Sequence, residues 1–539
     1  MQRIPHILLS ILMAYAAAGV RAQAVERPRL VVGIVIDQMR WDYLYRYADR
    51  YVEGGFRRLL REGFSCEQTF IPYVPSVTAI GHSCIWTGSV PSVHGIAGND
   101  FCVQGRKVYC CADTMVRPVG TSSEAGLMSP HNLWTTTVGD ELRLATNDRS
   151  KVVSVALKDR SAILPGGHHP NGAYWFDDSI GGFITSTYYT DTLPQWVEAF
   201  NERHLPQQYI RQTWQPLFPI NTYVQSTQDD RPDIEGELCG TFGVTFPYDL
   251  QAMQERDGWQ VLRKCPWGNT LTLELAKAAI EGENLGGGEE TDLLCVSCSS
   301  TDYVGHVVGT HAVETEDMYL RLDRDLADFL AYLDGHYGTG GYTVFLTADH
   351  GVLNSPPLLA ERQMPTGLWD NDEAMDALNR ALGEMFPSHA PLVTYVMNWQ
   401  VFFDVPLIDS LGYDYAQVKA RTVSILQRDA RVHYAVDMER AAWATVPQAV
   451  RERIINGYCR ERSGGVQVVP KPGWHDRNEP GTTHSVWAPY DTHIPLVFMG
   501  WGIPQGSTTR RVYMTDIAPT VAALLHIQMP SGCIGTPVF

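Results

Sequence analysis

The chain has 539 residues, and its 42 basic and 60 acidic side chains give a formal net charge of −18. Hydrophobic residues make up 44% and charged residues 19%, which is the balance of a globular protein and excludes an intrinsically disordered one. The strong net acidity excludes a broad basic face, so we expect no nucleic-acid partner. The same charge should repel small anions unless the site that binds them is locally positive.

The first residues have the pattern of an export signal. Arg3 precedes an apolar run over residues 7–18, and a small-residue cleavage site lies between Ala22 and Gln23. This run is too short to span a bilayer comfortably, and no later stretch reaches about 18 uninterrupted apolar residues. We therefore expect a signal peptide over residues 1–22, a periplasmic or secreted mature chain, and no stable membrane insertion.

Export would permit disulfides, and the chain contains 11 cysteines. Cys102 and either Cys110 or Cys111 flank a predicted hairpin, so we expect one bridge there. Cys295 and Cys298 have the C-x-x-C spacing of a zinc site. They lie within an apolar run and no second such pair is present, so we interpret them as buried thiols.

Short runs rich in β-branched residues alternate with helical patterns along the chain. The clearest helix covers residues 311–334, where apolar residues repeat at three- and four-residue spacing between two predicted strands. This alternation predicts a doubly wound α/β core with a mainly parallel sheet. The strands are expected at residues 30–36, 152–157, 293–298, 343–347 and 494–499.

Two gaps between the predicted strands are far longer than a crossover connection needs. They cover residues 166–291, which are rich in aromatic residues and proline, and residues 351–480. We interpret both as insertions that fold over the active-site face of one domain spanning residues 23–539.

Acidic and imidazole side chains recur where the predicted strands end or begin. In open α/β sheets, ligands bind at the carboxyl ends of the strands, so we expect these side chains to converge there. Carboxylate and imidazole groups without thiolates favour a divalent metal. The candidate ligands are Asp37, Asp302, His306, Asp349, His350 and His484.

A turn that leads into a helix of short side chains covers residues 72–82. Ser76 and Thr78 both offer a hydroxyl at the start of this helix, where unpaired N–H groups and the helix dipole favour anions. A hydroxyl attacks only when it is deprotonated, which coordination to a metal achieves. From the residues alone, both are candidate nucleophiles, and Thr78 fits the role of a helix N-cap equally well.

Together, these motifs resemble those of the alkaline phosphatase superfamily. The six ligands occur in the family's order, and Thr78 lies in a Pro-x-Val-Thr-x-x-Gly-His segment. The chain is most similar to the secreted phosphate-irrepressible, PafA-type alkaline phosphatases, and the match covers most of the mature chain. The resemblance implies a two-zinc site. One zinc would be held by Asp302, His306 and His484, and the other by Asp37, Asp349 and His350 together with Thr78.

The resemblance also implies a group of residues that binds the phosphoryl oxygens. It assigns Asn99, Lys158 and Arg160 to this role, although from the residues alone the segment 158–160 fits a solvated loop. Two divalent ions outweigh the three carboxylates, and Lys158 and Arg160 add further positive charge. The site would thus attract a phosphate dianion despite the acidity of the whole chain.

The resulting hypothesis is hydrolysis of small phosphate monoesters through a phosphothreonine intermediate. A phosphodiesterase or nucleotide pyrophosphatase on the same scaffold is the main alternative, and Lys158 and Arg160 weigh against it because those relatives lack the basic pair. A non-catalytic, zinc-stabilised binding protein is a further alternative, although a decayed enzyme should first lose its nucleophile or ligands. The sequence specifies neither the leaving group nor the oligomeric state.

Overall fold

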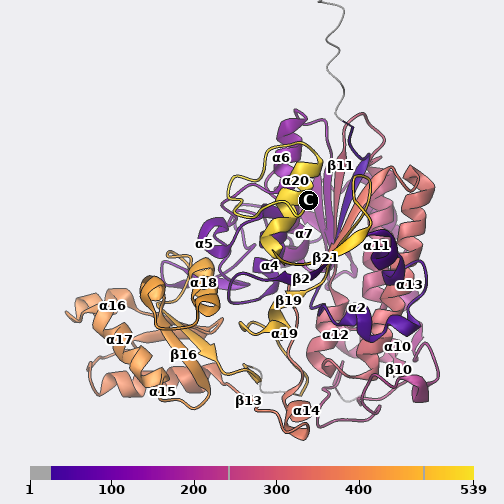
Figure 1. The fold of residues 1–539 in the computed structure, drawn as a ribbon. Helices are drawn as coiled ribbons and strands as arrows, with labels where there is room; N and C mark the ends of the chain where they lie inside the picture. Colours follow the sequence, from indigo (N-terminus) through magenta and orange to yellow (C-terminus); the bar gives the residue numbers. More distant parts are fainter. Residues whose placement is uncertain (1–25, 241–242, 477–479) are drawn as a thin grey trace, which may run out of the picture.

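The computed structural model describes residues 26–240, 243–476 and 480–539, so the predicted signal peptide lies outside the described residues. An 11-stranded mixed sheet forms the centre of the molecule (Figure 1). Five neighbouring strands in the middle of this sheet are parallel. In spatial order they are β12 (Tyr342–Thr347), β1 (Leu30–Ile36), β11 (Asp292–Cys298), β6 (Val152–Ala156) and β7 (Gly172–Asp177).

Helices cover both faces of the sheet, as the doubly wound prediction requires (Figure 1). The helix predicted at residues 311–334 forms as the long helix α13 (Val313–Tyr337). It packs with α11 (Trp267–Gly282) on one face of the sheet. The other face carries α6 (Val138–Ala145), α7 (Asp159–Gly166), α20 (Ile517–Leu524) and, most centrally, α4 (Thr78–Thr87).

A glycine in the central strand lets α4 approach the sheet closely. All seven residues of β1 are buried, as its apolar sequence predicts. A Cβ atom at Gly33 would lie 2.3 Å from the Trp86 ring of α4 and 2.4 Å from the Phe345 ring. The missing side chain therefore makes room for Trp86, and this packing holds α4 against β1 with Thr78 at the helix start.

One predicted strand runs in the opposite direction to the prediction. The segment 494–499 forms β19 (His493–Ile494) and β20 (Leu496–Gly500), and β20 pairs antiparallel with β12. The chain therefore enters β20 from the edge at which the parallel strands end. This reversal places His484, which precedes the strand, at the same edge as the other predicted ligands.

The two long segments between strands differ from each other. In the first, β7 and β8 (Gly182–Ser186) extend the main sheet, and short helices follow, including α8 (Gln195–Glu202) and α10 (Leu250–Asp257) with η4 (Gly258–Lys264). The second segment forms a separate lobe with its own apolar core (Figure 1, orange). Its sheet contains β14 (Val393–Met397), β15 (Gln400–Phe403), β17 (Val466–Pro470) and β16 (Val432–Asp437), flanked by α15 (Asn371–Gly383), α17 (Tyr415–Leu426) and α18 (Gln448–Gly457).

The predicted disulfide is absent, since the cysteines of the described residues are all free thiols. The predicted hairpin forms from β3 (Asp100–Val103) and β4 (Arg106–Tyr109), but its register pairs Cys102 with Lys107. Cys110 therefore lies beyond the paired strands rather than opposite Cys102. Within the ranges that the structure describes, no helix combines the length and apolar character needed to cross a membrane.

Candidate active site

The six predicted ligands converge at the carboxyl edge of the parallel strands. Asp37 directly follows β1, and one residue separates the end of β12 from the adjacent Asp349 and His350. Helix α12 (Ser300–Val308) begins just after β11, and it carries Asp302 and His306 one turn apart on the same side. His306 is partly exposed and the other five side chains are buried.

The first of two ligand groups contains Asp302, His306 and His484. Asp302 Oδ1 lies 3.2 Å from His306 Nε2 and 3.8 Å from His484 Nε2. His306 Nδ1 pairs with the Thr482 carbonyl at 2.9 Å, and His484 Nδ1 pairs with the Ser76 carbonyl at 2.7 Å. Because these carbonyls each occupy one ring nitrogen, both imidazoles present Nε2 to a shared point, as metal-binding histidines do.

The second group surrounds His350. Its Nε2 atom lies 3.5 Å from Asp37 Oδ1 and 3.4 Å from Asp349 Oδ2, while its Nδ1 atom pairs with the Gly351 carbonyl at 3.0 Å. Ligand atoms of Asp37, Asp302 and His350 also lie within 4.8 Å of one another. Asp302 therefore lies between the two groups, so cations bound in them would be close neighbours.

Two buried carboxylate oxygens in this cluster lack a protein partner. Asp37 Oδ1 and Asp349 Oδ2 accept no hydrogen bond from the described residues. Burial raises the pKa of Asp37 to about 8 and that of Asp349 to about 7. Buried, unpaired carboxylates are costly, and a divalent cation would supply the missing partner and favour their ionised form. The ligand cluster therefore fits divalent metal ions.

The two candidate nucleophiles differ in their surroundings. Thr78 is the first residue of α4, whose N-cap is Val77, so the alternative interpretation of Thr78 as the N-cap is wrong. Its Oγ1 atom lies 3.4 Å from His350 Nε2. Ser76 Oγ instead donates to the Val486 carbonyl at 3.0 Å. Of the two hydroxyls, only that of Thr78 lies against the metal-ligand cluster.

Lys158 reaches the cluster, and Asn99 lies beside the start of α4. Asn99 Oδ1 accepts the Ala79 N–H at 2.9 Å, which fixes the amide beside the start of α4. Lys158 Nζ lies 2.6 Å from both Asp37 Oδ2 and Asp302 Oδ2, so one buried ammonium bridges carboxylates of the two ligand groups. Burial opposes its charge, but Asp302 and Asp37 raise the pKa of Lys158, which keeps the lysine protonated.

A family model and several relatives match this chain. The model described as type I phosphodiesterase / nucleotide pyrophosphatase matches residues 31–494. Alkaline phosphatase PafA of Elizabethkingia meningoseptica is 48% identical, and the match covers 98% of each chain. Alkaline phosphatase PhoV of Synechococcus elongatus is 51% identical over 95% of this chain and 92% of its own. A Myroides odoratus protein named calcium-transporting ATPase is 48% identical over 99% of this chain and 98% of its own.

A solved structure of wild-type alkaline phosphatase PafA superposes with a TM-score of 0.93 at 49% identity, and the match covers 96% of this chain and 99% of that one. The chain belongs to the alkaline phosphatases of this family. The prediction of an alkaline-phosphatase-like α/β fold is confirmed. Members of this family depend on metal ions, in keeping with the two ligand groups described above.

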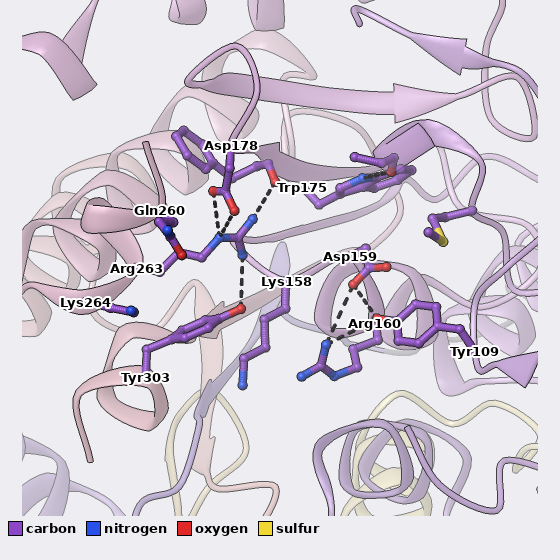
Figure 2. A pocket seen from close by; sticks show the side chains of 13 residues that line it. Tyr109, Lys158, Asp159, Arg160, Trp175, Asp178, Gln260, Arg263, Lys264 and Tyr303 are labelled. Carbon is purple, nitrogen blue, oxygen red and sulfur yellow. Dashed lines mark hydrogen bonds and ion pairs between the residues drawn. The ribbon is translucent and has the colours of Figure 1, made fainter. Parts of the chain in front are cut away.

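In this alkaline phosphatase, a cavity of about 470 Å³ opens beside Lys158 and Arg160 (Figure 2). Arg160 Nη1 lies 3.2 Å from the Tyr109 hydroxyl at one wall. At the opposite wall, Lys158 Nζ lies 4.9 Å from the centre of the Tyr303 ring. The phosphoryl-binding pair implied by the sequence is therefore flanked by two tyrosines that the sequence analysis did not single out.

Arg263 joins the elements around this cavity (Figure 2). Its guanidinium pairs with Asp178 at 2.8 Å and lies 3.4 Å from the Tyr303 hydroxyl. It also donates to the carbonyls of Leu157 at 2.9 Å and Phe176 at 2.8 Å, at the ends of β6 and β7. Since Leu157 directly precedes Lys158, Arg263 fixes the backbone from which that lysine extends. No motif marks Arg263 in the sequence, because it lies more than 100 residues from its carbonyl partner Leu157, which directly follows β6.

Proposed function

We propose that this alkaline phosphatase hydrolyses small phosphate monoesters with Thr78 as its nucleophile and two zinc ions as cofactors. The observation that carries this proposal is the position of the Thr78 hydroxyl, which lies at the start of α4 and against His350 of the ligand cluster. Attack on a phosphoryl group requires an activated hydroxyl and donors that bind the phosphoryl oxygens. A metal site beside Thr78 would activate the hydroxyl, and the helix N–H groups would bind the oxygens.

The carboxylate and imidazole donors of the two ligand groups would hold the ions. Bound there, divalent cations would lower the pKa of the Thr78 hydroxyl, polarise the phosphoryl group and stabilise the leaving oxygen. The donors are soft enough for zinc but would also accept Mn²⁺ or Co²⁺. The proposed sets are Asp302, His306 and His484 for one ion, and Asp37, Asp349, His350 and Thr78 for the other.

The residues of the chain would then carry the reaction in two steps. Thr78 Oγ1 attacks phosphorus in line, so the Oγ1–P bond forms, the bond to the leaving oxygen breaks, and a phosphothreonine results. Water next attacks phosphorus, which releases phosphate and restores the threonine hydroxyl. Asn99, Arg160 and the α4 N–H groups would hold the equatorial oxygens, where negative charge develops. Lys158 would hold Asp37 and Asp302 in place and add positive charge beside them.

A solved PafA variant supports these assignments. In this variant one threonine, an asparagine 21 residues later, one lysine, and an arginine two residues after that lysine are substituted, and its structure matches this chain with a TM-score of 0.93. In the present chain, Thr78 and Asn99 are likewise 21 residues apart, and Lys158 and Arg160 are two apart. The same four residue types, with the same spacing within each pair, are the residues proposed here.

The description of the matching family model favours a second candidate, a phosphodiesterase or nucleotide pyrophosphatase. A diester has one fewer negatively charged oxygen than a monoester, so Lys158 and Arg160 would stabilise its transition state less. We therefore propose the monoesterase, exported after cleavage near Ala22, with the segments at 166–291 and 351–480 acting as parts of one catalytic domain.

The test is to replace Thr78 and measure hydrolysis of an aryl phosphate by the metal-loaded enzyme. We expect Thr78→Ala to lower kcat/KM by at least about a thousandfold, because it removes the hydroxyl that lies beside His350 of the ligand cluster. Thr78→Ser is the matched control, since it keeps the hydroxyl and should retain most of the activity. Elemental analysis of both variants should show two zinc ions per chain. Near wild-type turnover by a metal-loaded Thr78→Ala would contradict the proposal.

A further inference from the structure

A second large cavity, of about 890 Å³, lies between the edge of the main sheet and helix α18 of the second lobe. Strand β21 (Gly506–Tyr513) contributes Arg510, Arg511 and Tyr513 to it. Arg511 and Tyr513 are two residues apart and thus lie on the same side of the strand, while Arg510 donates to the Val538 carbonyl at 2.9 Å. Helix α18 contributes Arg453 from the opposite wall. This cavity does not include any of the proposed catalytic residues.

The positive charges in this cavity are not balanced by protein carboxylates. Within the described ranges, neither Arg453 nor Arg511 forms an ion pair with an acidic side chain. Arg453 donates Nε to the Ile71 carbonyl at 3.2 Å and Nη1 to the Ala449 carbonyl at 3.4 Å, which leaves Nη2 available. Arg511 lies with its guanidinium 5.2 Å from the centre of the Phe70 ring. Burial and the nearby charge of Arg511 lower the pKa of Arg453.

The two acidic residues that line the cavity are already engaged elsewhere. Asp516 accepts the Tyr513 N–H and the Thr536 N–H, each at 2.9 Å. Glu452 accepts the Gln448 side-chain amide at 2.7 Å and is exposed. Neither carboxylate forms an ion pair with Arg453 or Arg511 in the described residues, although the charge of Glu452 acts to raise the pKa of Arg453 against the larger effect of burial.

The chain has a net charge of −18, so acidic partners are abundant. Several arginines elsewhere in the molecule pair with a carboxylate, as in Arg50–Glu316 at 2.6 Å and Arg58–Asp334 at 2.7 Å. In the described residues neither the partly buried Arg453 nor the exposed Arg511 has such a partner. Two like charges at one site repel each other unless an anion lies between them.

We propose that this cavity binds a small phosphate-type oxyanion between Arg453 and Arg511. Two guanidiniums present several N–H donors in planar forks, which match the oxygens of a phosphate group. The Tyr513 hydroxyl lines the same wall and can add a neutral donor. The site is separate from the proposed catalytic centre and does not depend on the proposed function.

The cavity is connected to the nucleophile segment through the backbone. Besides the bond from its side chain to Ile71, Arg453 accepts the Val74 N–H with its own carbonyl at 3.2 Å. Asn456, one turn further along α18, donates to the Pro72 carbonyl at 2.8 Å. An anion that orders Arg453 would therefore also order the segment that leads to Thr78.

The test is equilibrium binding of radiolabelled inorganic phosphate to the metal-loaded enzyme. The wild type should bind two phosphates per chain, one at the catalytic centre and one in the cavity. The variant R453M/R511M should bind one. Turnover of an aryl phosphate and the melting temperature report whether each variant is folded. R511M alone, which removes no bond to the backbone, should weaken the second phosphate at least tenfold.

Arg421→Met is the matched control, because Arg421 is an exposed arginine of the same lobe that lines neither cavity. It should still bind two phosphates. A single phosphate per chain in the wild type, or two in folded R511M with unchanged affinity, would overturn the proposal. Excess acetate should leave the second phosphate in place, and its displacement by acetate would show a carboxylate site instead of a phosphate site.

Discussion

The active site has two halves that are built in different ways. The metal-ligand half uses residues at the ends of core strands, among them Asp37 after β1 and Asp349 after β12, and these are fully buried. The other half, Lys158 and Arg160, which we propose acts on the phosphoryl group, lines an open cavity. Its supports come from elsewhere in the chain, and Arg263 belongs to a segment inserted between β8 and β11.

The difference indicates a division of roles. Ligands at strand ends are fixed by the sheet itself, so their geometry persists as long as the core is folded. The Lys158 ammonium pairs with Asp37 and Asp302 of the ligand groups. The backbone just before Lys158 is held by Arg263 of the inserted segment, and this support can change without loss of the sheet. We therefore expect changes in the metal-ligand half to abolish all activity, and changes in the other half to alter which esters are cleaved.

The largest effect that separates the halves should come from Lys158→Ala. We expect kcat/KM for an aryl phosphate monoester to fall by about 10²–10³, as for other groups that stabilise transition-state charge. The loss for a methyl aryl phosphate diester should be smaller, because a diester carries less charge. The measurement is the ratio of the two kcat/KM values. Lys277→Ala, which removes a lysine paired with Asp328, is the control and should leave the ratio unchanged. Equal losses for both esters would show that the halves do not differ in this way.

A smaller effect should come from Arg263→Met. Because Arg263 holds the Leu157 carbonyl and the Tyr303 hydroxyl, its loss should displace Lys158 and lower monoester kcat/KM about tenfold. In the Lys158→Ala background the same substitution should have almost no further effect, since the residue through which it acts is missing.

The control for Arg263 is Arg321→Met, which removes another partly buried arginine–aspartate pair, Arg321 with Asp317 at 2.6 Å. It should lower the melting temperature without changing the ratio of monoester to diester rates. Additive losses in the Arg263→Met, Lys158→Ala double variant would refute the positioning role.

The smallest effect concerns the contact between the inserted segment and helix α13 of the core. Glu314 of α13 accepts the Tyr248 hydroxyl of this segment, and burial raises its pKa to about 8. The unfolded carboxyl ionises near 4.3, so the folded chain binds more protons over this range, and stability falls as the pH rises toward 8. Glu314→Gln should therefore melt about 2–4 °C above the wild type at pH 9, with a smaller difference at pH 5 and unchanged turnover. A difference that does not vary with pH would contradict this assignment.

Much of the fold and of the ligand set could be predicted from the chain alone. Strands such as β1 and β11 are buried along their whole length and mostly apolar because both faces of their sheet are covered, and this leaves a clear pattern in the sequence. Acidic and imidazole residues placed at the ends of such runs must meet at one edge. The register of the hairpin at residues 100–109 left no such pattern. The prediction of a disulfide at Cys102 was wrong because the observed register pairs Cys102 with Lys107.

The sequence by itself predicted the candidate ligands that follow parallel strands, such as Asp37 and Asp349, because parallel strands bring their carboxyl ends together whatever the loops do. Only the tertiary structure placed His484 at that edge, through the antiparallel direction of β20. It also favoured Thr78 over Ser76 as the proposed nucleophile, since both hydroxyls have suitable chemistry and differ in their contacts. It also decided the direction of β20 and the role of Arg263. These features depend on contacts between residues far apart in the chain, and local composition and periodicity do not predict such contacts.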